Sequence, residues 1–186
     1  KALMGFAAGI MVAASVWSLL IPSMEESAAL GSLSFLPAVI GFWIGTVFLL
    51  ALDHIIPHLH LYAQEAEGPK SKLSKTIMMA LAVTLHNIPE GLAVAVPLGS
   101  GGMPKPRSVL VTALPGFPAV LGAVLGFMVG AMGPTALALS LSFASGAMLY
   151  VVFGELMPEA ILMWRSKLPA AATVIGMLTG VIIIYA

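Results

Sequence analysis

The chain has 186 residues, of which 60% are hydrophobic and 9% charged, and its formal net charge is zero. A soluble domain carries about 25% charged residues, so this composition excludes a soluble globular protein and indicates one embedded in the lipid bilayer. The absence of a basic tract argues against nucleic acid as a partner, and the absence of cysteine excludes disulfides and thiolate ligands.

Apolar runs of about 20 residues recur along the chain, and each is long enough to cross the hydrocarbon core as an α-helix. Backbone groups in lipid need partners within their own segment, which favours helices. The sequence therefore predicts one all-α domain, residues 1–186, built as a polytopic bundle of transmembrane helices. The expected spans are Ala2–Ile21, Phe35–Ile56, Thr76–Leu98, Val109–Val129, Pro134–Met157 and Pro169–Ala186.

The charges of the loops test this topology, because Lys and Arg gather in short cytoplasmic loops. If each of the six spans crosses once, four basic residues fall on either side of the membrane. One more crossing between the third span and Lys105 brings all eight to the side of Lys1. The charges therefore indicate a missing helix. The chain also opens almost directly into a hydrophobic helix, which indicates an N-terminal truncation.

The first span carries Met11 and Ser18, which lie seven residues apart and therefore on one helix face. Taken alone, both are core residues. The second span ends in LDHIIPHLH, which contains Asp53, His58 and His60. Such a cluster is typical of a station that receives a metal ion at a pore mouth, although loop histidines are also ordinary solvated residues.

The third span contains the most polar cluster, LHNIPEG. An ionisable side chain inside the membrane costs about 3 kcal/mol or more and usually has a function. His86 and Glu90 lie one turn apart on the same helix face, and imidazole with carboxylate suits zinc or another divalent metal. Asn87 adds a carbonyl oxygen, and Pro89 frees the carbonyl of Leu85. A kinked helix without ligands and a proton relay are the alternatives.

The fifth span ends in GELMPEA, residues 154–160. Glu155 lies about one turn before the end of the predicted helix, and Pro158 frees the carbonyl of Gly154 as Pro89 does for Leu85. A glutamate at a helix end can simply reach the lipid headgroups, so the sequence does not decide whether Glu159 has a function. Glu155 is therefore the candidate in this segment.

The segments MGFAAGIMVAAS, DHIIPHLH, HNIPEG and ELMPEA, in this order, resemble the ZIP (Zrt-, Irt-like protein) family of divalent metal transporters, in its prokaryotic branch. The resemblance implies a bundle of normally eight helices that moves zinc, and in some members Fe²⁺, Mn²⁺ or Cd²⁺, toward the cytoplasm. It implies metal ligands at a mid-membrane site, pathway positions and an exit cluster. The implied ligands of the mid-membrane site are His86, Asn87, Glu90 and Met11. The implied pathway positions are Ser18 and Glu155. The implied exit cluster consists of Asp53, His58 and His60.

The chain also departs from the family's pattern. A second PEG motif is absent, and GLAVAVPLGSGGMPKPRS is similar to the end of the family's next helix, so the two motifs look fused by an internal deletion between Glu90 and Lys105. Ala119 stands where relatives have a glutamate of a second metal site, Gly154 replaces a frequent His or Glu, and the family's first helix is absent before Lys1.

Two functional interpretations follow. In the first, the protein is not an enzyme but a transporter with Zn²⁺ as its transported substrate, located in a bacterial inner membrane and with a homodimer as one expected assembly. In the second, it is a degenerate relative that binds metal without transport, or only packs as a membrane bundle. An intramembrane metalloenzyme has no support, because no HExxH or paired aspartate motif occurs.

Overall fold

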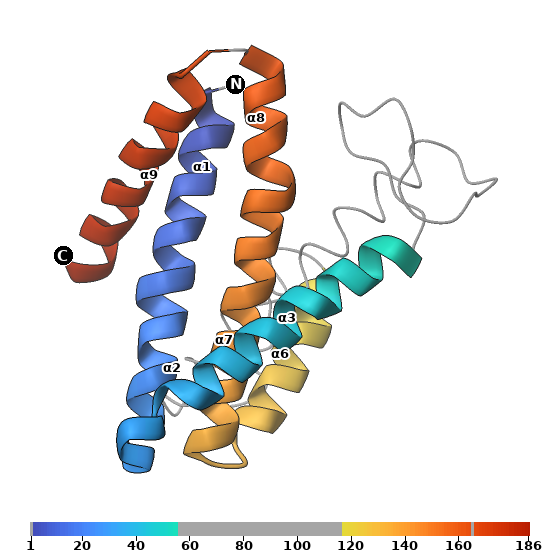
Figure 1. The fold of residues 1–186 in the computed structure, drawn as a ribbon, viewed down its shortest axis with the longest axis vertical. Coiled ribbons are helices and arrows are strands. Elements are labelled where there is room, and N and C mark those ends of the chain that lie inside the picture. The colour runs from blue at the N-terminus through green and yellow to red at the C-terminus, as the bar shows by residue number, and fades with distance from the viewer. Residues whose placement is uncertain (1, 56–116, 165) are drawn as a thin grey trace.

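The computed structural model describes residues 2–55, 117–164 and 166–186, and every regular element in these ranges is a helix (Figure 1). This confirms the predicted all-α fold. Among the described residues, four helical stretches are long and apolar enough to cross a membrane: Ala2–Glu26, Phe35–Ile55, Pro134–Leu162 and Leu168–Tyr185. The predicted span Thr76–Leu98 lies outside these ranges.

The first span consists of three helical pieces in a row. Helix α1 (Ala2–Ala13) continues into the π-helical segment η1 (Ala14–Leu20) and then into α2 (Ile21–Glu26). The span thus runs beyond the predicted end at Ile21, because Pro22 falls in the first turn of α2, where its missing N–H is tolerated. A short 3₁₀ helix, η2 (Ala28–Leu33), leads to α3 (Phe35–Ile55).

The C-terminal half begins with α6 (Phe117–Gly130), which is joined by a short turn to α7 (Pro134–Val151). Gly133 provides the turn with a φ of 130°, which side chains rarely allow. A second π-helical segment, η3 (Val152–Leu156), links α7 to α8 (Met157–Trp164), so this span also passes its predicted end at Met157. The last helix is α9 (Leu168–Tyr185).

Glycine brings α3 and α7 into close contact. A Cβ atom on Gly45 would lie 2.8 Å from the carbonyl carbon of Phe143 and 3.1 Å from the amide nitrogen of Ala147. Gly146 of α7 meets the backbone of Phe42 in the same way. Small residues allow helix backbones to approach this closely in membranes, and α3 with α7 forms the most extensive helix contact of the described residues.

The contact between α1 and α9 uses the same device. A Cβ atom on Gly9 would lie 2.6 Å from the amide nitrogen of Met177, and Gly176 faces the backbone of Phe6. These two helices form the second extensive contact of the described bundle. Figure 1 shows α9 beside α1, and α3 crossing the bundle beside α7.

Both close pairs run parallel. Along each contact, the residue numbers of both helices increase in the same direction. For α3 and α7 the contacting residues are Gly41 with Leu139, Gly45 with Phe143 and Asp53 with Tyr150. For α1 and α9 they are Gly5 with Pro169, Gly9 with Thr173 and Ala13 with Gly180. In each pair the two helices therefore begin at the same end of the bundle.

The parallel arrangement also places the start of α1 at the same end of the bundle as the turn between α8 and α9, which carries the exposed Lys167 (Figure 1). The predicted deletion between Glu90 and Lys105 concerns residues outside the described ranges and remains a prediction.

The apolar core has two parts. One joins Leu19 to Leu137, Leu141, Ala144 and Met148 of α7, and the other joins Leu49 to Ala147 and Val151.

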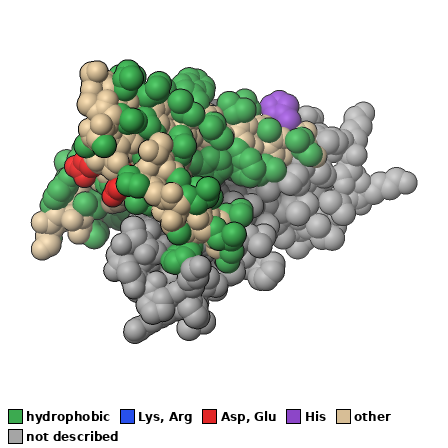
Figure 2. Space-filling view, turned by 90° about the horizontal axis from the view of Figure 1, so that it is seen from below, with side chains coloured by type: hydrophobic (Ala, Val, Ile, Leu, Met, Phe, Trp, Pro, Cys, Tyr) green, Lys and Arg blue, Asp and Glu red, His purple; other side chains and the backbone are tan. Residues whose placement is uncertain are grey.

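Large apolar side chains cover the outside of the bundle. Trp43 on α3 is 62% exposed, and Ile182 on α9 is 66% exposed. Figure 2 shows hydrophobic side chains spread over the described part of one face, with few charged side chains among them. A soluble protein rarely exposes so much apolar surface, and a lipid bilayer is the solvent that matches it.

Candidate functional site

Buried hydroxyl groups line the contacts between the described helices. Ser145 of α7 is fully buried, and its Oγ donates to the carbonyl oxygen of Ser15 in η1 at 2.9 Å. Thr46 Oγ1 of α3 donates to the carbonyl oxygen of Gly146 at 3.3 Å. These bonds join helices but bring no charge into the bundle, so they hold the first span and α3 against α7 without forming a cation site by themselves.

Two π-helical segments interrupt the two longest spans, and each contains one predicted pathway residue. Ser18 lies in η1, and Glu155 lies in η3. Both residues are half-buried. The segment η1 packs against α7, and η3 packs against α1. Each π-helical segment therefore contacts the span that contains the other one. Single π-helical turns are frequent at functional sites because they displace side chains and carbonyls from the regular helix.

A proline two residues beyond each segment explains why the helix widens. Leu20 ends η1 before Pro22, and Leu156 ends η3 before Pro158. The proline ring clashes with the carbonyl four residues back and lacks the N–H that would bond to it. The chain instead bonds five residues back, from Ile21 to Val16 and from Met157 to Val152. Pro158 is among the prolines considered in the sequence prediction, whereas Pro22, which carries the same signal, is not.

Met11 lies on α1 in an apolar setting. It is half-buried and packs against the cluster that contains Leu141, Ala144 and Met148 of α7. Its carbonyl oxygen accepts the hydroxyl of Ser15 at 2.7 Å. The structure thus shows Met11 as part of the packing between the first span and α7, and a role as a metal ligand stays a prediction.

Asp53 is the predicted exit residue that the described ranges include. It lies in the last turn of α3, is only 8% exposed, and accepts a hydrogen bond at Oδ2 from the hydroxyl of Tyr150 on α7 at 2.6 Å. Tyr150 is not among the residues predicted from the sequence, because 97 positions separate it from Asp53. The neighbouring His54 is exposed and makes a hydrogen bond through Nδ1 with the carbonyl of Leu50.

The remaining predicted ligands lie outside the described residues: His58, His60, His86, Asn87 and Glu90. Among the residues that the structure describes, no three His, Asp or Glu side chains gather closely enough to hold a metal ion. The described part therefore contributes Asp53, Glu155, Met11 and Ser18 as separate positions along the helices, and their assembly with the central motif stays a prediction.

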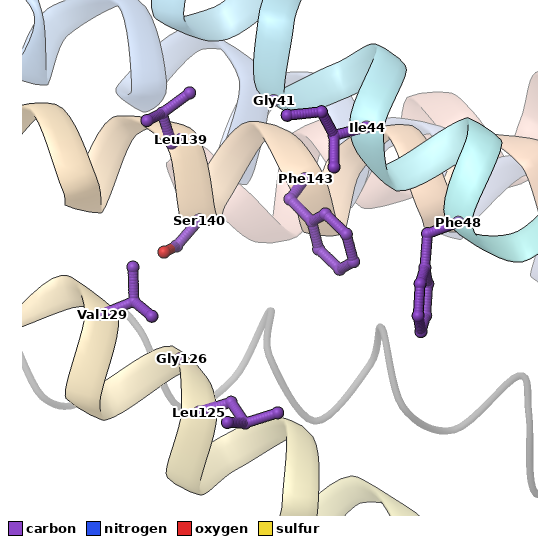
Figure 3. Close-up of a pocket in the computed structure, with 9 residues that line it drawn as sticks. All are labelled: Gly41, Ile44, Phe48, Leu125, Gly126, Val129, Leu139, Ser140 and Phe143. Carbon is purple, nitrogen blue, oxygen red and sulfur yellow. The ribbon is translucent and has the colours of Figure 1, made fainter.

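An apolar cavity of about 420 Å³ lies between α3, α6 and α7 (Figure 3). Ile44, Phe48, Leu125 and Phe143 are among its walls, and Ser140 is its polar side chain. The Ser140 hydroxyl already donates to the carbonyl of Ala136 at 2.9 Å. A cavity with this lining offers no ligand set for a divalent cation, which needs several oxygen, nitrogen or sulfur donors.

Comparison with known proteins gives a consistent result. A family model described as ZIP Zinc transporter matches residues 66–186. Zinc transporter ZIP11 of Bos taurus is 27% identical, covering 93% of this chain and 84% of its own length. Zinc transporter ZIPB of Bordetella bronchiseptica is 28% identical, covering 96% of this chain and 67% of its own length. Zinc transporter GufA of Myxococcus xanthus is 31% identical, covering 77% of this chain and 70% of its own length.

Proposed function

Because the chain belongs to the ZIP zinc transporter family, we propose that it carries divalent metal cations, with zinc preferred, across the membrane toward the cytoplasm. It is an integral membrane protein, with four described helices of transmembrane length and an apolar exterior. Its relatives include proteins named zinc transporters from animals and bacteria, which supports zinc as the substrate.

The proposed central site consists of His86, Asn87 and Glu90, with Met11 as a fourth donor. The motif supplies one imidazole and one carboxylate a turn apart, and these are donors that zinc prefers. Metal binding requires both groups in their deprotonated forms, so protons in the pathway would compete with the cation. The cation would lose its water at the entrance and exchange it for these ligands.

The observation that carries the proposal is the pair of π-helical segments in the two longest described spans, each packed against the span that contains the other. Ser18 and Glu155 each lie in one of them, and each segment packs against the other span. A widened turn exposes carbonyl oxygens that a regular helix would use internally. These two segments support the proposal, because a path for a cation needs polar groups from more than one span in a bundle that is otherwise apolar.

The proposed direction rests on where the charges lie. Lys167 is at the end of the bundle to which α8 leads, and loops with Lys and Arg favour the cytoplasmic side. Because α3 runs parallel to α7, Asp53 near the end of α3 lies toward that same end. We therefore place the exit, with Asp53, His58 and His60, on the cytoplasmic side.

Zinc uptake into proteoliposomes tests this function. Glu90→Ala should abolish uptake at equal protein density, whereas Glu26→Ala, which removes an exposed carboxylate at the end of α2, should leave it unchanged. Unchanged uptake by the Glu90 variant would refute the proposed pathway. Zinc binding by calorimetry without any flux through the wild-type protein would instead identify a relative that binds metal but does not transport it.

The same assay addresses the range of metals. Fe²⁺, Mn²⁺ and Cd²⁺ would be added in turn as competitors of labelled zinc. Imidazole and carboxylate groups are donors that can bind all of these ions, so we expect each of them to compete with zinc. The order of their potencies as competitors gives the metal preference of the site. Zinc uptake that is insensitive to the other three would define a zinc-specific pathway.

A further inference from the structure

The bond between Tyr150 and Asp53 joins two helices at a buried carboxylate. Asp53 is the only aspartate of the chain. The Tyr150 hydroxyl lies 2.6 Å from its Oδ2 atom, and the Tyr150 ring packs against the apolar cluster that contains Leu49 and Val151. The ring is therefore held by the contact between α3 and α7, and its hydroxyl is directed at one particular carboxylate oxygen.

A buried carboxylate is costly unless hydrogen bonds satisfy it, and carboxylates that bind metals are generally oriented by such bonds from neighbouring groups. An ionised aspartate has about four acceptor positions, so it can accept one phenol and still ligate a cation. We propose that Tyr150 is a positioning residue of the transport pathway, which orients the Asp53 carboxylate to receive the divalent cation. This inference rests on the proposed function.

The Tyr150 ring also lies beside the segment that carries the second acidic residue of the predicted pathway. Gly154, one turn further along, leaves space beside the ring: a Cβ atom there would lie 3.9 Å from Tyr150 Cζ. The next residue is Glu155, the other acidic residue of the predicted pathway. Tyr150 thus contacts Asp53 on α3 through its hydroxyl and adjoins the segment that carries Glu155 through its ring.

A single isotopic label can test the inference directly. Aspartate labelled with ¹³C at its side-chain carboxyl gives one NMR signal, because Asp53 is the only residue of its type. In wild-type protein in liposomes, zinc should shift this signal. Tyr150→Phe keeps the ring but removes the hydroxyl, so it should shift the signal before zinc is added and weaken the zinc titration by about tenfold, as the loss of a partner of a metal ligand generally does.

Thr46→Val provides the matched control. It also removes a hydroxyl that bonds from α3 to α7, but the hydrogen bonds of Thr46 Oγ1 go to the carbonyls of Phe42, at 3.0 Å, and Gly146, at 3.3 Å, and not to Asp53. It should leave both the carboxyl signal and the zinc titration unchanged. Circular dichroism checks that each variant retains the helix content of the wild type.

Zinc flux supplies the second readout. Tyr150→Phe should raise the zinc concentration for half-maximal uptake by about tenfold, and it should have no further effect in an Asp53→Asn background, because Tyr150 acts through that carboxylate. An equal effect of Thr46→Val, or a full effect of Tyr150→Phe in the Asp53→Asn background, would overturn the inference and leave Tyr150 as a packing residue.

The two readouts separate this inference from the proposed function. If the wild-type protein moves no zinc but its Asp53 signal responds to zinc and to Tyr150→Phe as described, transport is refuted and the assignment of Tyr150 to a metal-binding carboxylate stands. If zinc is transported but the Asp53 signal does not respond to it, the inference about Tyr150 is refuted and transport stands.

Discussion

Gly45→Ala tests whether close glycine contacts hold α3 against α7. The added Cβ atom would overlap the carbonyl oxygen of Phe143 and lie 2.8 Å from its carbonyl carbon, whereas ordinary contacts of this kind begin at 3.4 Å. The overlapping atoms are backbone, so no side chain can rotate away. The helices must therefore separate by more than about half an ångström, which forfeits roughly a quarter or more of the dispersion energy of each contact.

The expected loss follows from two opposing terms. Overpacking of a well-packed contact destabilises by about 1–3 kcal/mol, while replacing glycine by alanine within a helix gains about 1 kcal/mol. The difference is a net destabilisation of about 0–2 kcal/mol, and its upper end corresponds to a factor of roughly 30 in the ratio of folded to unfolded protein. This ratio can be measured by unfolding in mixed micelles with increasing denaturing detergent.

Gly154→Ala is the control for this measurement. Its Cβ atom would meet only the Tyr150 ring, at 3.9 Å, which is an ordinary contact. This variant should be as stable as the wild type or slightly more stable, because only the gain from helix propensity remains. If Gly45→Ala and Gly154→Ala unfold at the same detergent fraction, the close contact between α3 and α7 does not contribute as we argue.

Two further predictions concern single polar groups. Ser145→Ala removes the 2.9 Å bond to the carbonyl of Ser15 and should destabilise the protein by about 0.6 kcal/mol, the average for such bonds between membrane helices; no change in the same unfolding assay would count against a role of this bond. Glu155→Gln should slow zinc uptake without changing that unfolding transition, since Glu155 is half-buried in η3, and uptake at the wild-type rate would exclude it from the pathway.

The hydropathy pattern predicts the helices well and their ends less well. The start of α3 at Phe35 agrees with the prediction, because a polar segment precedes it and a long apolar run follows. The predicted ends at Ile21 and Met157 are too early, and both lie directly before a proline. The residue before a proline usually leaves the helix. Here the π-helical turns absorb the clash, so the helix continues past Pro22 and Pro158.

The candidate site could be predicted only where its signal is local. A proline three residues after a glutamate is visible in the sequence, and it identified the segment of Glu155 as unusual. The partner of Asp53 could not be identified in this way, because Tyr150 lies 97 positions away and on a different helix. Their contact depends on which way α3 and α7 run relative to each other, and no periodicity within either helix contains that information.

The direction of the helices therefore decides whether the predicted pathway residues lie at the same end of the bundle. If α3 ran antiparallel to α7, Asp53 at the end of α3 would lie near Pro134, at the opposite end of α7 from Glu155. The parallel contact, in which Gly41, Gly45 and Gly146 allow the close approach, instead brings Asp53 to Tyr150, one turn before Gly154. The glycines thus allow the two backbones to meet, and the parallel direction of the helices places Asp53 at the same end of the bundle as Glu155.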